Sequence, residues 1–240
     1  MTFDDGPHVY THDLLDLLDS YGAKATFFVN GNNYGRGDIN DPTTPWPGMI
    51  KRMHLSGHQI GSHTWDHIDM DVVDFWDRRQ QMTQLEHAFI DILGFYPVYF
   101  RPPYTSCSLD CQFDIGKMGY HVVDYDLDTL DWANDSVDDI EISKDGFAEA
   151  IMGSNPAYDS FLVLSHDVHQ FTVYSLTGYM LQMAKERGYK LVTVGQCLAD
   201  PAENWYRLPG ETEPRRKKGS YNGELYSGIK DANSTANKTV

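Results

Sequence analysis

The chain has 240 residues, of which 35 are Asp or Glu and 19 are Lys or Arg, giving a formal net charge of −16. This length favours one domain with one core, and the negative charge argues against a nucleic-acid partner, whose phosphates require a basic surface. No apolar run reaches the about 18 residues of a transmembrane helix. We therefore expect a neutral or cationic partner and no membrane insertion.

The predicted elements alternate along the chain. Apolar spacing of the helical type, with glycines at several ends, predicts helices at 11–22, 49–57, 74–94, 111–119, 143–153 and 176–188. Short apolar runs predict strands at 23–31, 58–64, 97–103, 120–127, 160–167 and 189–194. Short connections between alternating elements are typical of a parallel sheet, either a barrel or a doubly wound sheet.

Composition sets the domain boundary. Residues 1–207 carry the alternating pattern and form the predicted catalytic domain, whereas residues 208–240 are polar and charged and predict a flexible tail. At the other end, Thr2 and Phe3 look like the last residues of a strand. We expect the rest of this first strand, and a signal peptide, to be missing from the chain.

Three cysteines and three glycosylation sequons bear on the compartment. Cys107 and Cys111 lie four positions apart, where a local disulfide forms easily; a zinc cluster is the alternative, but no CxxC is present. Cys197 is left over and would pair upstream of the chain. With sequons at Asn134, Asn233 and Asn237, these features favour a secreted protein in an oxidising or cell-wall setting.

Polar clusters follow five of the apolar runs. They read "DDGP" at 4–7, "SHTWDH" at 62–67, "RPPY" at 101–104, "DTLDW" at 128–132 and "SHDVH" at 165–169. Taken alone, "DDGP" is an ordinary turn signal. Because the carboxyl ends of barrel strands carry the chemistry of such folds, five clusters in this position predict a site there instead.

His63 and His67 are four residues apart, so one helical turn would bring both imidazoles to one side. Two histidines and one carboxylate, here Asp4 or Asp5, are a common catalytic zinc set with open positions for water and substrate. His54 and His58 have the same spacing, but no strand precedes them and a glycine lies between them. We expect a structural hydrogen bond for His58 rather than a metal.

Other strand-end residues offer acid–base chemistry. Arg101 can orient a carboxylate through its guanidinium fork, and Asp131 beside Trp132 places a carboxylate against a large apolar ring. Arg101 could instead be a plain surface charge, and Asp131 could simply belong to an acidic loop. His166 is a candidate general acid, and His169, three residues further on, is its weaker competitor.

In order, the five clusters resemble the five motifs of the NodB-homology polysaccharide deacetylases, carbohydrate esterase family 4, over residues 1 to about 206. The stretches "FFVNGNN", "RPPYTSC", "LSHDVH" and "VTVGQCLADPAENWY" resemble the fungal chitin deacetylase branch. The resemblance implies a distorted (β/α) barrel and metal-dependent removal of N-acetyl groups from chitin or chitooligosaccharides, giving chitosan and acetate.

Motif by motif, the resemblance also implies roles. Asp5, His63 and His67 would bind Zn²⁺, although the same ligands accept Co²⁺ or another divalent metal. The base would be Asp4, positioned by Arg101, and the acid His166, oriented by Asp131. Substrate contacts would come from the Tyr104 N–H as an oxyanion donor and from Trp132 and Leu164 as walls of an acetyl pocket.

The alternatives keep the fold and change the function. An acetylxylan esterase or a peptidoglycan N-deacetylase would use the same site on another polymer. An inactive carbohydrate-binding relative would lack the base, a ligand or the acid, and a purely structural barrel would hold no metal. We expect the active enzyme, as a monomer.

Overall fold

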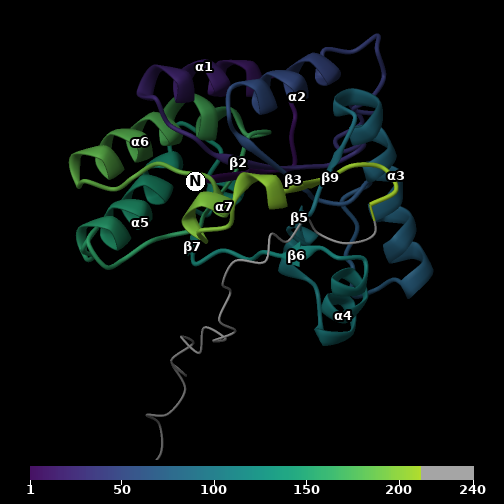
Figure 1. The fold of residues 1–240 in the computed structure, drawn as a ribbon. Coiled ribbons are helices and arrows are strands. Elements are labelled where there is room, and N and C mark those ends of the chain that lie inside the picture. The colour runs from purple at the N-terminus through teal and green to yellow at the C-terminus, as the bar shows by residue number, and fades with distance from the viewer. Residues whose placement is uncertain (212–240) are drawn as a thin grey trace, which may run out of the picture.

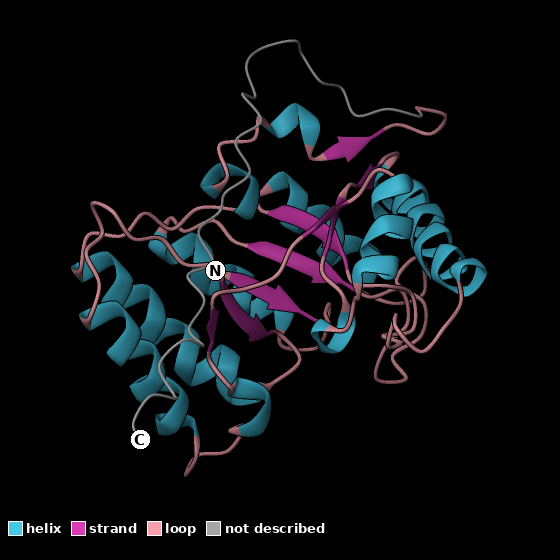
Figure 2. Cartoon of the chain, turned by 90° about the horizontal axis from the view of Figure 1, so that it is seen from below, coloured by secondary structure: helices cyan, strands magenta, loops and turns pink. Residues whose placement is uncertain are grey.

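The computed structural model describes residues 1–211. The predicted tail at 208–240 lies almost wholly outside this range, as do the sequons at Asn233 and Asn237. The described chain alternates strands and helices in the predicted order, and its centre is a parallel sheet surrounded by helices (Figure 2).

In the described part of the chain, seven strands form the central sheet, in the order β6-β5-β3-β2-β1-β8-β7, and every pairing is parallel. Their bounds are Thr2–Asp4 (β1), Thr26–Val29 (β2), Gln59–Ser62 (β3), Tyr99–Phe100 (β5), His121–Val122 (β6), Leu127–Asp128 (β7) and Val163–His166 (β8). The three residues of β1 lie in the middle of the sheet, between β2 and β8.

The two edge strands show that the sheet is curled. β6 and β7 lie at opposite edges, yet only residues 123–126 connect them. Five Cα steps span at most about 19 Å, whereas a flat sheet of this size would separate its edge strands by about 29 Å. The sheet therefore bends into a half-barrel, which confirms the predicted distorted barrel in an open form.

Within residues 1–211, seven α-helices flank the sheet, and the six that were predicted are confirmed. Their bounds are Thr11–Tyr21 (α1), Trp46–Leu55 (α2), Phe75–Leu93 (α3), Leu109–Lys117 (α4), Ile140–Met152 (α5), Thr177–Glu186 (α6) and Val194–Cys197 (α7). In Figure 1, α1 and α2 lie together over one side, α5 and α6 at one end, and α3 and α4 at the other. No helix within residues 1–211 is long and apolar enough to cross a bilayer.

Local signals explain where the main helices begin and end. The Asp74 carboxylate accepts hydrogen bonds from the N–H groups of Trp76 and Asp77 and so starts α3. At its other end Gly94 takes the left-handed conformation that closes a helix, with φ of 84°. On α1 the buried face is Leu14, Leu15 and Leu18, which joins a core containing Phe3 and Phe27 of the sheet.

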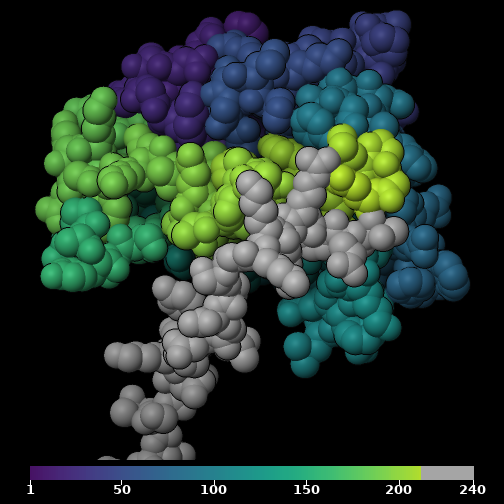
Figure 3. Space-filling view, viewed as in Figure 1, coloured from purple at the N-terminus to yellow at the C-terminus, as the bar shows by residue number. Residues whose placement is uncertain are grey.

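Segments far apart in the sequence meet around this core. Residues of α1 contact α6, and in Figure 3 the purple and blue N-terminal part lies directly against the green segment around α6. Further along, β4 (Tyr96–Pro97) pairs antiparallel with β9 (Tyr206–Arg207). This pairing ties the end of the described chain to its middle.

Two predicted strands differ from the structure. The run at 120–127 is not one strand, because it supplies β6 at one edge of the sheet and β7 at the other. The predicted strand at 189–194 is wrong: within residues 1–211 this segment pairs with no strand, and its Leu191 carbonyl accepts a bond from the Lys24 N–H. Thr193 then caps α7 through a capping box.

Candidate active site

The five polar clusters meet at the carboxyl ends of the strands, as predicted. They follow β1, β3, β5, β7 and β8, which lie in one sheet. Around them is a cleft of about 400 Å³. Nine of the ten predicted site residues line it, namely Asp4, Asp5, His63, His67, Arg101, Tyr104, Trp132, Leu164 and His166. The tenth, Asp131, is fully buried beneath His166.

Asp5, His63 and His67 converge on one point of the cleft. The Asp5 Oδ1 atom lies 3.3 Å from His63 Nε2 and 3.1 Å from His67 Nε2, and all three ligand atoms lie within 4.8 Å of one another. Burial opposes ionisation of Asp5, but the neighbouring imidazoles outweigh it and hold the pKa of this carboxyl well below its ordinary value. The cluster thus combines one carboxylate with two imidazoles.

These three residues fit a divalent metal. Asp5 Oδ1 is buried and makes no hydrogen bond of good geometry, although two imidazole nitrogens face it. His63 Nδ1 lies 2.7 Å from the Arg101 carbonyl, so this nitrogen carries the proton and leaves the Nε2 lone pair free. An oxygen and two imidazole nitrogens are a donor set that zinc and related ions accept.

Asp4 points to a different partner from its neighbour. The Arg101 side chain is buried, and its Nη1 donates to Asp4 Oδ1 at 3.0 Å and also bonds Thr2 Oγ1. Nη2 donates to the Asp124 carbonyl at 2.9 Å, and the guanidinium stacks on Phe28, 4.4 Å from the ring centroid. Held at both Nη atoms and on one face, Arg101 presents a fixed donor to Asp4.

His166 also lines the cleft, and Asp131 lies behind it. The two side chains meet at 2.8 Å between Nδ1 and Oδ1, and Asp131 Oδ2 also accepts bonds from the His166 N–H and the Thr172 hydroxyl, both at 2.7 Å. Burial alone would lower the pKa of His166, but the charge and hydrogen bond of Asp131 raise it to about 10. The parallel register of β1 and β8 puts His166 directly beside Asp4.

The competing histidines occupy other environments. His169 also lines the cleft, and its Nδ1 lies 3.2 Å from Asp135 Oδ2, so it forms a second, more exposed His–carboxylate pair. His58 is buried away from the cleft, where its Nδ1 accepts the Ala25 N–H at 3.2 Å. Burial lowers the pKa of His58 to about 4. The predicted structural hydrogen bond of His58 is confirmed.

The remaining predicted contacts form the walls of the cleft. Leu164 is buried in β8, whereas Trp132 is 55% exposed. Tyr104 follows Pro103 with a left-handed backbone, φ of 57°, and its ring lies against that of His67. The Tyr104 ring therefore lies on the same side of the cleft as His67.

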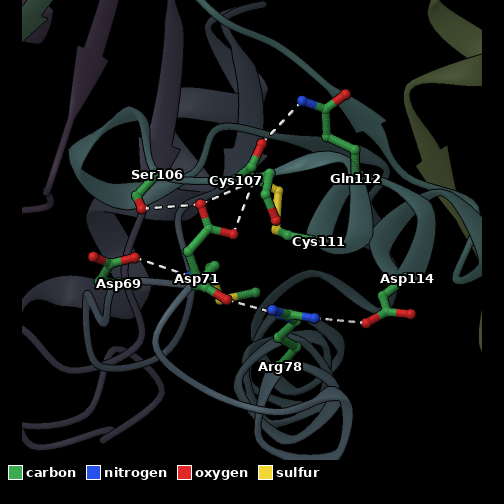
Figure 4. Close-up of a disulfide and its surroundings, with 10 residues drawn as sticks. Asp69, Asp71, Arg78, Ser106, Cys107, Cys111, Gln112 and Asp114 are labelled. Carbon is green, nitrogen blue, oxygen red and sulfur yellow. Dashed lines mark hydrogen bonds and ion pairs between the residues drawn. A yellow bond between two sulfur atoms is a disulfide. The ribbon is translucent and has the colours of Figure 1, made fainter.

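A disulfide stands beyond Tyr104. Cys107 and Cys111 are joined, with their Cα atoms 5.1 Å apart, so the predicted local disulfide is confirmed and the zinc alternative is wrong. Figure 4 shows the supporting bonds: Asp71 accepts from Ser106, and Gln112 donates to the Cys107 carbonyl at 2.9 Å. Cys197 is a free thiol in the described chain.

Several residues that contact Asp5, Gly6 or His63 were missed by the sequence analysis. Asn30 follows β2 just as the other clusters follow their strands, so the same strand-end signal could have found it. Arg36 lies in the loop between β2 and α2 and carried no signal of its own. The Tyr34 hydroxyl lies 3.4 Å from Asp5 Oδ2. Asp167 is buried next to Gly6, where burial raises the pKa of its carboxyl to about 7.

Comparison with known proteins identifies the family. Residues 1–123 match the family described as polysaccharide deacetylase. A chitin deacetylase of Colletotrichum lindemuthianum is 44% identical over 207 residues, covering 86% of this chain and 82% of that protein. A chitin deacetylase of a Pestalotiopsis species is also 44% identical, over 88% of this chain and 66% of that protein.

The fold agrees with a solved relative. The structure of the chitin deacetylase from Colletotrichum lindemuthianum superimposes with a TM-score of 0.82 at 45% identity, covering 86% of this chain and 89% of that one. The chain belongs to the polysaccharide deacetylase family and is a hydrolase of that class.

Proposed function

We propose that the protein hydrolyses N-acetyl groups of chitin or chitooligosaccharides in a reaction that depends on a divalent metal, giving free amines and acetate. The observation that carries the proposal is the pairing of two separate devices in one cleft. The first consists of Asp5, His63 and His67, next to the Asp4–Arg101 pair; the second is His166, backed by Asp131. Amide hydrolysis needs both a base and an acid.

The metal ligands proposed are Asp5, His63 and His67. A divalent ion bound there lowers the pKa of water towards about 7 and polarises an acetamide carbonyl. We propose Zn²⁺, with Co²⁺ as an alternative, since both accept the same donors. The contact of His63 Nδ1 with the Arg101 carbonyl supports this set, because it fixes the tautomer that a ligand requires.

Asp4 is the proposed base. Its carboxylate takes the proton of the attacking water, whose oxygen then bonds to the acetamide carbon. Arg101 keeps the carboxylate in place through the 3.0 Å bond to Oδ1. Because the guanidinium is itself fixed by Asp124 and Phe28, Asp4 does not have to reorient before the reaction.

His166 is the proposed acid. When the carbon–nitrogen bond breaks, the departing amine requires a proton, and a His166 whose pKa is raised to about 10 carries one at neutral pH. Asp131 engages Nδ1, so Nε2 is the atom that can donate to the amine. Base and acid are then different groups. Asp4 takes the proton of the water and His166 gives a proton to the amine, so neither side chain has to do both.

The acetyl group has its own proposed contacts. Trp132 and Leu164 supply apolar surface in the cleft for the methyl group. The backbone N–H of Tyr104 is the proposed donor to the oxyanion. The loss of one such donor typically costs about 3–4 kcal/mol of transition-state stabilisation.

The choice of chitin rests on the two relatives named chitin deacetylase and on the neutral or cationic partner that the acidic chain favours. The Cys107–Cys111 disulfide supports the proposal that the protein is secreted, since such bonds persist in oxidising compartments.

Acetate release tests the proposal. The protein is incubated with chitooligosaccharides, acetylxylan or peptidoglycan, with zinc or with a chelator, and acetate is measured. We expect release from chitooligosaccharides, loss with chelator and recovery on adding zinc. Release from acetylxylan or peptidoglycan alone would favour an enzyme for that polymer. Binding without release from any of them would favour the inactive relative.

A further inference from the structure

Arg36 lies in the loop between β2 and α2, yet its side chain turns back towards the ends of β1 and β2. The loop around it is well defined by its own contacts. Ile39 is fully buried and its N–H donates to the Gly31 carbonyl at 2.9 Å, while Trp46 Nε1 donates to the Arg36 carbonyl at 3.0 Å. The loop backbone around Arg36 is therefore held by hydrogen bonds, one between residues on either side of it and one to its own carbonyl.

The guanidinium donates to four backbone carbonyls. Nη1 bonds the carbonyls of Asp5 at 3.0 Å and Asn33 at 3.3 Å. Nη2 bonds those of Gly6 at 3.0 Å and Asn30 at 2.9 Å. These carbonyls come from the turn after β1, from the end of β2 and from the loop itself, so one side chain joins three segments.

The first of these segments needs such support. Asp5 has φ of 75°, a left-handed conformation that is uncommon for a residue other than glycine. The turn that carries the Asp5 carboxylate therefore begins at a residue in an unfavourable backbone conformation. With the carbonyls of Asp5 and Gly6 both held by Arg36, the turn cannot relax without breaking two charge-assisted bonds.

The second segment leads to the metal-binding histidine. Asn30 N–H donates to the Gly6 carbonyl at 3.2 Å, and Asn30 Nδ2 bonds the carbonyls of His63 and Thr64. Arg36 holds the Asn30 carbonyl. A continuous chain of bonds thus runs from the backbone of Asp5 through Arg36 and Asn30 to the backbone of His63.

We propose that Arg36 is a positioning residue for the metal site, which fixes the backbone of Asp5 relative to that of His63 so that their ligand atoms stay together before metal binds. The proposal rests on the metal site proposed above. The role of Arg36 depends on the shape of its guanidinium rather than on its charge alone, because two nitrogens each bond two carbonyls from separate segments. A lysine keeps the charge but has a single ammonium that cannot replace a planar fork.

Two other roles would explain the contacts differently. If Arg36 only anchored its loop, its loss would lower stability and leave metal affinity unchanged. If its charge alone mattered, because Asp5 and Asp167 are both near, lysine would substitute fully. Zinc affinity of the metal-free protein, measured apart from activity, separates the three roles.

The test uses Arg36→Lys and Arg36→Gln with Arg52→Gln as the matched control. Arg52 lies on α2, bonds Asp16 and Asp19 at the surface, and is not among the residues that line the cleft. Metal is stripped, the fold is checked by near-UV circular dichroism, and Zn²⁺ alone is titrated against a chromogenic chelator.

We expect both Arg36 variants to raise the Kd for Zn²⁺ by about 10–100-fold, the range for residues that orient metal ligands, while Arg52→Gln stays at the parent value. Parent-like zinc affinity in folded Arg36 variants would overturn the proposal, and so would full rescue by lysine. Failure of both Arg36 variants to fold would also overturn it, in favour of a structural role. A parent protein that binds no zinc would instead overturn the metal site itself.

Discussion

Asp4 and Asp5 are consecutive in the chain, yet their carboxylates belong to different clusters. Asp4 Oδ1 lies 3.0 Å from Arg101 Nη1, whereas Asp5 Oδ1 lies 3.1 Å from His67 Nε2. The division arises because Asp4 is the last residue of β1 and Asp5 takes a left-handed backbone immediately after it. Two neighbouring aspartates can therefore serve one reaction in two different ways.

Asp131→Asn should move the alkaline limit of activity to lower pH. The carboxylate of Asp131 raises the pKa of His166 to about 10 from an ordinary 6.5, and an amide cannot do so. An acid works while it is protonated, so the parent should keep activity until pH approaches 10. The variant should lose activity from about pH 6.5 upward. A pH–kcat profile measures this, and an unmoved alkaline limb would contradict the role of Asp131.

The same pair predicts a change in stability with pH. The folded pKa of His166 lies above its ordinary value, so the pair's stabilisation is complete below pH 6.5 and is lost as pH rises through about 10. Urea unfolding between pH 6 and 10 should show a steeper fall for the parent than for Asp131→Asn. The control for the activity profile of Asp131→Asn is Asp135→Asn, which alters the more exposed pair of Asp135 with His169. This variant should leave the alkaline limb of activity in place.

Arg101→Lys should lower kcat about 100-fold or more while leaving metal content unchanged. A single ammonium nitrogen cannot reproduce the planar fork, in which Nη1 bonds Thr2 and Asp4 while Nη2 bonds the Asp124 carbonyl, so Asp4 loses its fixed orientation. The metal ligands are untouched, since only the backbone carbonyl of Arg101 contacts His63. Steady-state kinetics and metal analysis check both parts. A lysine variant with the parent's kcat would show that orientation by the fork is unimportant.

Trp132→Ala should lower kcat/KM for acetylated substrate about tenfold or more, the scale of one lost apolar contact in a pocket. The side chain is 55% exposed, so its removal leaves no sealed cavity and should change the melting temperature little. Trp132→Phe, which keeps an apolar ring, should recover part of the loss. Equal kcat/KM in the alanine variant and the parent would remove Trp132 from the acetyl pocket.

Much of the fold could be predicted because apolar runs and helical spacing report burial directly. The six helices and the strands β1, β2, β3, β5 and β8 follow those patterns. The segment at 189–194 has a strand-like composition too, but composition does not reveal whether a partner strand lies beside it, and within residues 1–211 none pairs with it. Likewise, nothing local in 120–127 shows that it spans two edges of a curled sheet.

The site was predictable where strand ends gather its residues. His63, Arg101 and His166 each follow an apolar run, and the parallel sheet brings them into one cleft. Arg36 could not be found in this way, because its role depends on a loop that folds back over the turn after β1. Contacts from a side chain to distant backbone carbonyls leave no periodic trace in a sequence.

The division of roles between the two aspartates is the central claim, and metal content beside turnover tests it most directly. Asp4→Asn and Asp5→Asn differ from each other by one position, so each is the other's matched control. We predict that Asp4→Asn retains the parent's zinc stoichiometry and loses deacetylation of chitooligosaccharides, whereas Asp5→Asn loses zinc itself. Loss of zinc from Asp4→Asn, or full zinc in Asp5→Asn, would contradict the account.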